Sequence, residues 1–209
     1  MFPNSAFTHG SSAHLVLLAQ LAASKIPVRG APDWLADDRT DLFVKTDSGS
    51  VAVINPDKTA EPRRLPLGDS GLCQGIGAGG GAIWSCDPNP SGTTDDLLRV
   101  SLRSGKVERF EVGKRPDQGH LDVAADQVWV STDAGLVGLN VETRRPDTPI
   151  DLRVPGTDLT TTDERAYVVS RGAGAVASVD LINRRVVAQS NVADPRNCSR
   201  RRSVDAHRQ

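Results

Sequence analysis

Apolar and polar residues alternate in short runs along most of this chain, and each run ends at a turn-forming residue. Four of the runs carry one aromatic residue, and each is followed by a second alternating run that ends in Asn, Ser or Asp. A period of two is typical of β-strands with one buried face. The aromatic runs are 41–45, 82–86, 127–131 and 165–170, and their partner runs are 50–55, 97–101, 135–140 and 175–180.

The same order of elements recurs about every 40 residues, a spacing typical of propeller-type repeats. Each unit opens with a short segment whose shared apolar residue is Val28, Leu67, Val112, Val154 or Val192. A strand after each opener and a further short strand, such as 106–112 or 185–189, bring each unit to four strands. The repeat region is therefore 26–197, and the units are about 26–66, 67–111, 112–153 and 154–191, with a fifth beginning at 192.

The pattern predicts an all-β fold of about four four-stranded antiparallel propeller blades. We expect the blades to form an arc, as a truncated piece of a larger ring, because the opener at Val192 begins another unit. A closed four-bladed ring is the alternative. One sheet alone buries too little apolar surface, so the blades must stack. The aligned aromatics are therefore predicted to pack between blades: Phe43, Trp84, Trp129 and Tyr167.

Two terminal segments fall outside the repeats. Residues 1–25 contain the apolar run 15–23, which resembles the core of an export signal, although no Lys or Arg precedes it. A leader and a short helix are both open interpretations. Residues 198–209 are rich in Arg and carry no strand pattern, so a disordered basic tail is expected there.

Charge and hydropathy exclude two classes of partner. With 25 Lys and Arg against 26 Asp and Glu, the net charge of -1 does not provide the basic excess of a nucleic-acid-binding protein. No run approaches the ~20 apolar residues that a membrane span needs. The expected partner is an unidentified protein or small-molecule ligand.

The three cysteines suggest one disulfide. Folding 73–86 as a hairpin around a turn at Gly79–Gly80 sets Cys73 directly opposite Cys86. The two would form a non-hydrogen-bonded pair with Cα atoms about 4.5 Å apart, which a disulfide can bridge. A Cys73–Cys86 disulfide implies an oxidising, extracytoplasmic location. The alternative is two free thiols in the cytoplasm, and Cys198 in the tail is expected to be unpaired.

Candidate chemistry is sparse. His120 is the only one of four histidines inside the repeats, so it is a weak catalytic candidate and no histidine metal site is predicted. No cofactor is expected. The longest loop of the array is 87–96, and loops at blade ends commonly bind ligands. Its candidate binding residues are Asp87, Asn89, Asp95 and Asp96.

Three stretches carry a resemblance to a family: 32–36, the pair 41–45 and 49–56, and the pair 127–131 and 135–140. They resemble bacterial YVTN-type repeats, in a style similar to virginiamycin B lyase and NHL propellers. The resemblance implies a propeller, often exported and often without enzymatic activity. The lyase branch uses histidines on one face and a magnesium ion to open a cyclic antibiotic. Only His120 is available here, so no catalytic residue is carried over.

The leading functional expectation is a non-catalytic binding or scaffold module of the cell envelope or exterior, with an unknown ligand. A Mg²⁺-dependent streptogramin lyase-like enzyme is the first alternative. A truncated product without function is the second.

Overall fold

The computed structural model describes residues 26–58, 61–67, 75–88, 95–113 and 121–192. Within these ranges the chain forms strands β1 to β15 and no helix, in antiparallel sheets whose strands follow chain order. Each sheet is called a blade and numbered from the N-terminus. The apolar–polar alternation sets this structure, because each strand turns one residue in two toward a neighbouring blade.

Three blades have four strands each. Blade 1 contains β1 (Pro32–Asp37), β2 (Leu42–Thr46), β3 (Ser50–Ile54) and β4 (Arg63–Pro66). Blade 2 contains β5 (Ile76–Gly79), β6 (Ala82–Pro88), β7 (Asp95–Ser101) and β8 (Val107–Gly113). Blade 4 contains β12 (Asp158–Thr161), β13 (Arg165–Ser170), β14 (Ala175–Asp180) and β15 (Arg185–Asn191).

Blade 3 has three regular strands, β9 (Leu121–Ala124), β10 (Gln127–Thr132) and β11 (Gly135–Asn140), and an irregular outer segment. That segment meets β11 through two isolated bridges, Leu136 to Ile150 and Leu139 to Pro146. Proline has no N–H to donate, so Pro146 and Pro149 interrupt the ladder that would otherwise make a fourth strand. The edge is held instead where Leu136 and Ile150 exchange backbone hydrogen bonds of 2.9 and 2.8 Å.

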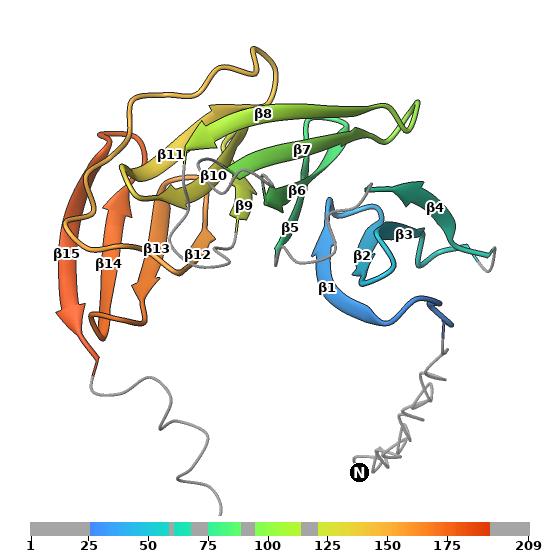
Figure 1. Cartoon of the computed structure of the whole chain (residues 1–209), viewed down its shortest axis with the longest axis horizontal. Helices are drawn as coiled ribbons and strands as arrows, with labels where there is room; N and C mark the ends of the chain where they lie inside the picture. Colours follow the sequence, from blue (N-terminus) through green and yellow to red (C-terminus); the bar gives the residue numbers. More distant parts are fainter. Residues whose placement is uncertain (1–25, 59–60, 68–74, 89–94, 114–120, 193–209) are drawn as a thin grey trace, which may run out of the picture.

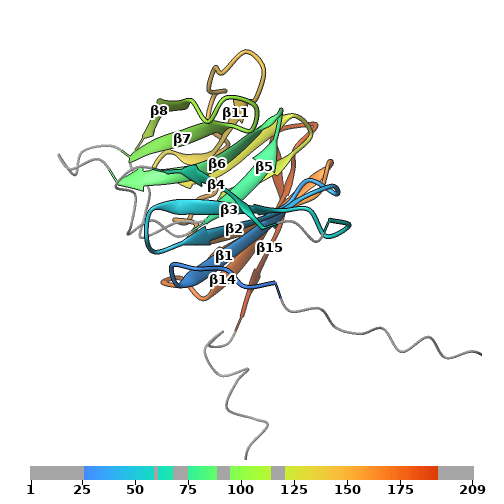
Figure 2. The same cartoon turned by 90° about the vertical axis from the view of Figure 1, so that its right-hand side faces the viewer.

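The four blades fan out in an open arc, with blade 1 and blade 4 at its two ends (Figure 1). The first strand of each blade lies innermost: β1 contacts β5, β5 contacts β9, and β9 contacts β12. Figure 2 shows the sheets from the side, with blade 1 in front of blade 4. The predicted all-β class and the arc of propeller blades are confirmed.

Each pair of successive blades shares one hydrophobic cluster. The face of a blade that looks toward the next blade is here called its forward face, and the opposite one its backward face. Each cluster contains the aromatic residue on the forward face of one blade. It also contains residues of the following blade that come directly before or after that blade's own aromatic in the sequence. Phe43 shares a cluster with Ile83, Trp84 with Val128 and Val130, and Trp129 with Ala166 and Val168.

The fourth aromatic is more exposed than the other three. Phe43, Trp84 and Trp129 are at most 2% exposed, whereas Tyr167 is 44% exposed. Tyr167 occupies the same position on the forward face of blade 4, but no described sheet packs on that face. Burial at this position depends on a following blade, so the predicted inter-blade packing of Tyr167 stays a prediction.

Candidate functional site

A polar hollow of about 390 Å³ opens where the first turns of blades 1 and 2 meet. The β1–β2 turn supplies Asp37, Asp38 and Arg39, and the β5–β6 hairpin supplies Gly79, Gly80 and Gly81. Ala78, Leu102 and Val123 provide its apolar lining. We call it the turn-end hollow, because the β1–β2 and β5–β6 turns leave their sheets at the same end.

Hydrogen bonds within the β1–β2 turn hold the two carboxylates at the rim of the turn-end hollow in place. Asp37 Oδ1 accepts the Arg39 N–H at 3.1 Å. Asp38 Oδ1 accepts the N–H groups of Thr40 and Asp41 at 3.0 and 2.8 Å. These side chain-to-backbone bonds replace ladder bonds where the chain reverses. They hold Arg39 at a positive φ of 72° and leave a cation beside two carboxylates.

The opposite wall is almost free of side chains. Gly80 and Gly81 have φ of 59° and 66°, the pair of positive values that a two-residue type I′ hairpin turn requires. A Cβ atom at Gly80 would lie 2.9 Å from the Val141 side chain of blade 3. The glycines therefore keep the hairpin narrow and allow blades 2 and 3 to approach closely.

A second hollow, of about 240 Å³, lies at the other end of blade 3. It is lined by the β10–β11 turn and by 151–155, including Arg153. The local turn repeats that of the first hollow: Asp151 Oδ1 accepts the Arg153 N–H at 2.8 Å, and Arg153 has φ of 61°. The chain thus presents two similar Asp–x–Arg turns at opposite ends of the blades.

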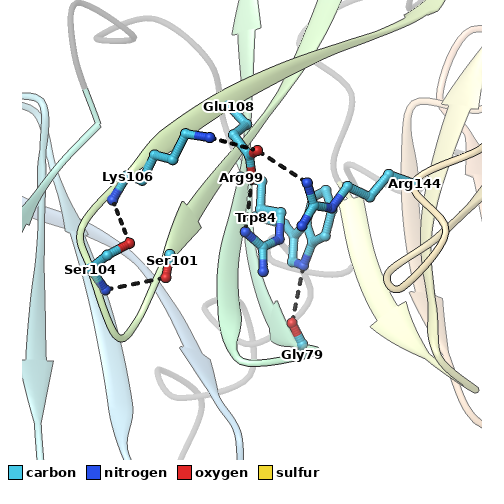
Figure 3. A network of polar contacts seen from close by, with 8 residues as sticks. All are labelled: Gly79, Trp84, Arg99, Ser101, Ser104, Lys106, Glu108 and Arg144. Atoms are coloured by element: carbon cyan, nitrogen blue, oxygen red, sulfur yellow. Dashed lines mark hydrogen bonds and ion pairs between the residues drawn. The ribbon is translucent and has the colours of Figure 1, made fainter.

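Glu108 of β8 is the centre of an ion-pair network on blade 2 (Figure 3). Its Oε2 lies 3.0 Å from Arg99, and its Oε1 lies 3.3 Å from Lys106 and 3.1 Å from Arg144. Arg144 comes from the turn after β11, so this contact ties blade 3 to blade 2. Arg99 also lies 5.9 Å from the centre of the Trp84 ring. The network has the geometry of an inter-blade clamp.

Blade 4 repeats the clamp one unit later. Arg184 follows β14 at the position that Arg144 holds after β11, and both have positive φ, 53° and 60°. Arg184 Nη1 lies 2.8 Å from the Asp147 carboxylate of blade 3, and its guanidinium lies 5.8 Å from the Trp129 ring. The repeat indicates that the Glu108 network is an element of blade construction.

The network makes stability depend on pH. Hydrogen bonding from Lys106, together with the charges of Arg144 and Lys106, holds the pKa of Glu108 below its ordinary value of 4.5. A lowered folded-state pKa stabilises the fold above 4.5, and that contribution is lost as the pH falls through the folded value. We therefore expect Glu108→Gln to lower the Tm at neutral pH, and the difference from wild type to narrow as the pH falls below 4.5.

Circular dichroism melts at a series of pH values check this expectation. Glu111→Gln is the matched control, because Glu111 is an exposed carboxylate on the same strand. It should leave the Tm close to wild type throughout. A Glu108→Gln deficit that stays constant down to strongly acidic pH would contradict the assignment of the effect to ionised Glu108.

The structure bears on one cysteine of the predicted disulfide and on the register of its hairpin. Cys86 is fully buried on β6 and is disulfide-bonded. Cys73 and Cys198 lie outside the described residues, so the Cys73–Cys86 pairing stays a prediction. The register assumed for it is wrong: Gly79 pairs with Ala82 and Ile76 with Ser85, which makes Gly80–Gly81 the turn. The residue opposite Cys86 in this register is therefore position 75, not 73.

The predicted binding loop is shorter than expected. Asp87 pairs with Asp96, and Pro88 with Asp95, so these acidic residues belong to strands β6 and β7. The ladder continues because β8 pairs with Asp95 and Asp96 from the other side. Asn89 and His120 lie outside the described residues. Their predicted roles in binding and catalysis remain untested.

Sequence reasoning missed the residues of the turn-end hollow. The candidates predicted from the sequence belong to one long loop, whereas the hollow is lined by short turns of separate blades. The repeat itself carried a signal for these residues, because equivalent turns of successive blades lie at the same end of the blades.

In the part of the chain that the structure describes, no three His, Cys, Asp or Glu residues cluster as metal ligands. The same residues include no helix able to span a membrane.

Comparison with known proteins identifies the fold and no family. No family model matches the chain, and no curated protein matches it. Among solved structures, the Myceliophteria thermophila Cps50 (Swd1) β-propeller domain matches with a TM-score of 0.62 at 12% identity, over 82% of this chain and 59% of that one. A nidogen/laminin complex matches at 0.57 and 16%, over 80% and 67%.

BamB from Moraxella catarrhalis matches with a TM-score of 0.54 at 14% identity, over 76% of this chain and 48% of that one. This chain thus spans from about half to two thirds of these propellers. At identities this low the likeness concerns the fold alone. The chain has a β-propeller fold, and its described residues form four blades.

Proposed function

We propose that the chain is a non-catalytic β-propeller binding module that takes an extended protein segment in the turn-end hollow. The carrying observation is the hollow itself, with its apolar floor and its rim of Asp37, Asp38 and Arg39. A floor of small and aliphatic residues suits short apolar side chains, while carboxylate and guanidinium groups suit the polar groups of a peptide. Rigid turns on a stacked scaffold are common binding sites.

The mixed charge of the rim argues for a polypeptide partner. A phosphate or nucleic-acid ligand would be repelled by Asp37 and Asp38, the two carboxylates that precede Arg39 in the rim. A peptide offers both signs of charge together with backbone groups. One structural neighbour of this chain comes from a complex of two proteins, nidogen and laminin, which fits a role in protein binding.

We further place the module in the cell envelope or exterior, as a relative of YVTN- and NHL-type repeat propellers. The disulfide-bonded Cys86 supports an oxidising compartment. The repeated aromatic strands, such as 82–86 and 127–131, support the repeat type. The lyase alternative rests on His120, which lies outside the described residues, so we do not propose it.

Selection of a random-peptide phage library on the immobilised chain tests the proposal. We expect enriched peptides to lose at least about tenfold in affinity for Arg39→Glu, because a rim cation becomes a like charge beside Asp37 and Asp38. Arg153→Glu is the matched control, since Arg153 has the same Asp-bonded turn and positive φ at the opposite end. It should bind the peptides as wild type does.

Isothermal calorimetry with a synthetic form of the top peptide gives the affinities. Peptides that weaken with Arg153→Glu and not with Arg39→Glu would move the site to the hollow at the other end. A library that yields no peptide binding to the wild-type chain would contradict the proposal.

A further inference from the structure

At the two ends of the arc, one side of the repeated inter-blade contact has no described blade packed on it. These two sides are the backward face of blade 1 and the forward face of blade 4. In each described interface, an aromatic forward face is covered by the residues before and after the aromatic position of the next blade. Those covering residues are at most 3% exposed: Ile83, Ser85, Val128, Val130, Ala166 and Val168. On blade 1 the equivalent residues are Leu42 and Val44, and both are partly exposed.

The uncovered half on blade 1 is formed by β1 and β2, because Ala52 and Ile54 of β3 on the same face are buried. Leu35 of β1 pairs with Val44 and therefore lies on the same backward face, where it is 62% exposed. The uncovered half on blade 4 is centred on Tyr167, at 44% exposure. Within the described residues, no sheet packs on either face. One face thus presents the aromatic of the repeated contact, and the other presents the residues that cover such an aromatic.

We propose that a second copy of this chain covers both faces, with blade 4 of each copy packed on blade 1 of the other. A second copy fits because the repeat makes the two faces halves of the same contact. Tyr167 of one copy would lie where Trp129 lies against Ala166 and Val168, with Leu42 and Val44 of the other copy as its cover. This association goes beyond the peptide binding proposed above and does not depend on it.

One polar group on the forward face of blade 4 lacks a partner within the described residues. Arg165 lies two residues before Tyr167 on the forward face, and its Nη1 is buried without a hydrogen-bond partner. The carboxylate of Asp180, its neighbour across the sheet, already accepts bonds from Asn183. Asp37 pairs with Leu42 on the backward face of blade 1. The backward face also carries Arg64, which pairs with Ala52 and is already bonded to Ser50 Oγ and to the Arg29 carbonyl oxygen, so Asp37 is the acceptor that this face offers to Arg165 of a second copy.

Ring closure explains why the association would stop at two copies. A head-to-tail contact produces an open fibre unless the rotation closes. The part of this chain that matches BamB covers 48% of the BamB chain, so two arcs correspond to a ring of BamB's size and not to the smaller Swd1 domain, of which 59% is covered. Closure also removes both open ends of the arc at once, which favours the dimer over longer assemblies.

Sedimentation equilibrium on the full 209-residue chain tests the proposal. We expect the wild-type chain to have twice the mass of one chain. Tyr167→Asp and Leu35→Asp should each weaken self-association at least about 100-fold, because each places an unpaired charge in both contacts of the symmetric dimer. Both positions are exposed in the single chain, so folding should be preserved, as circular dichroism would confirm. Ile182→Asp, at an exposed residue of the β14–β15 turn and not in a strand of either face, should remain dimeric.

Mixing the two variants provides the decisive measurement. In a Tyr167→Asp and Leu35→Asp heterodimer, one contact carries both substitutions and the other carries neither. The equimolar mixture should therefore dimerise more tightly than either variant alone. A monomeric wild-type chain would overturn the proposal. So would variants that dimerise as well as wild type, or a mixture that is no tighter than its components.

Discussion

Trp84→Ala is expected to destabilise the chain by about 3–5 kcal/mol, the usual cost of removing a large buried aromatic. Trp84 is completely buried between blades 2 and 3, in a cluster that includes Leu97 and Val128. Its ring lies 5.9 Å from the Phe110 ring, and its Nε1–H donates to the Gly79 carbonyl oxygen at 3.1 Å. Alanine would leave a cavity at the interface and remove the indole donor to the Gly79 carbonyl oxygen. Urea unfolding followed by circular dichroism measures the loss.

Two further variants separate the contributions. Trp84→Phe keeps an aromatic ring but removes the donor to Gly79, so it should cost clearly less than alanine, about 1–2 kcal/mol. Ile182→Ala, at an exposed turn residue, should change the free energy of unfolding by no more than about 0.5 kcal/mol. If Trp84→Ala were as mild as Ile182→Ala, the inter-blade cluster would not be the main source of stability.

The blade architecture was predictable because it depends on local patterns. Alternation marks the strands, and one aromatic for each unit marks the second strand of each blade. Phe43, Trp84 and Trp129 lie in clusters that join successive blades. Tyr167 has the same sequence pattern and a different environment. A residue's pattern shows which face it lies on, but its burial depends on whether another blade covers that face.

Register and strand ends were less predictable. The three successive glycines 79–81 allow two placements of a two-residue turn, and the structure selects Gly80–Gly81. The hydrogen bond from Trp84 to Gly79 belongs to that register. In 87–96 the composition of Asp, Pro, Asn and Gly is typical of a loop, yet pairing extends the strands to Pro88 and Asp95. Long-range ladders override local turn preference in both cases.

The candidate site was the least predictable part. The turn-end hollow combines Asp37 to Arg39 with residues about 40 positions later. No single segment carries a motif for it, since Asp38 and Arg39 are ordinary turn residues in the sequence. The inter-blade ion pairs of Arg144 and Arg184 were equally difficult to predict from the sequence. Their shared role is recognised only when the turns after β11 and β14 are compared. In both turns the arginine side chain forms an ion pair with the preceding blade.

Gly135→Ala is expected to cost about 2–5 kcal/mol, from backbone strain together with overpacking. Gly135 has φ of +124°, and a Cβ there would be driven into the carbonyl oxygen of Ile150. The same carbonyl accepts the Leu136 N–H, so relieving the clash breaks the bond that holds the irregular outer segment of blade 3. Gly172→Ala is the control, because no atom lies within 4 Å of its Cβ position and its φ is not positive. Urea unfolding should show Gly172→Ala within about 0.5 kcal/mol of wild type. Equal stability of the two variants would mean that blade 3 does not depend on this edge.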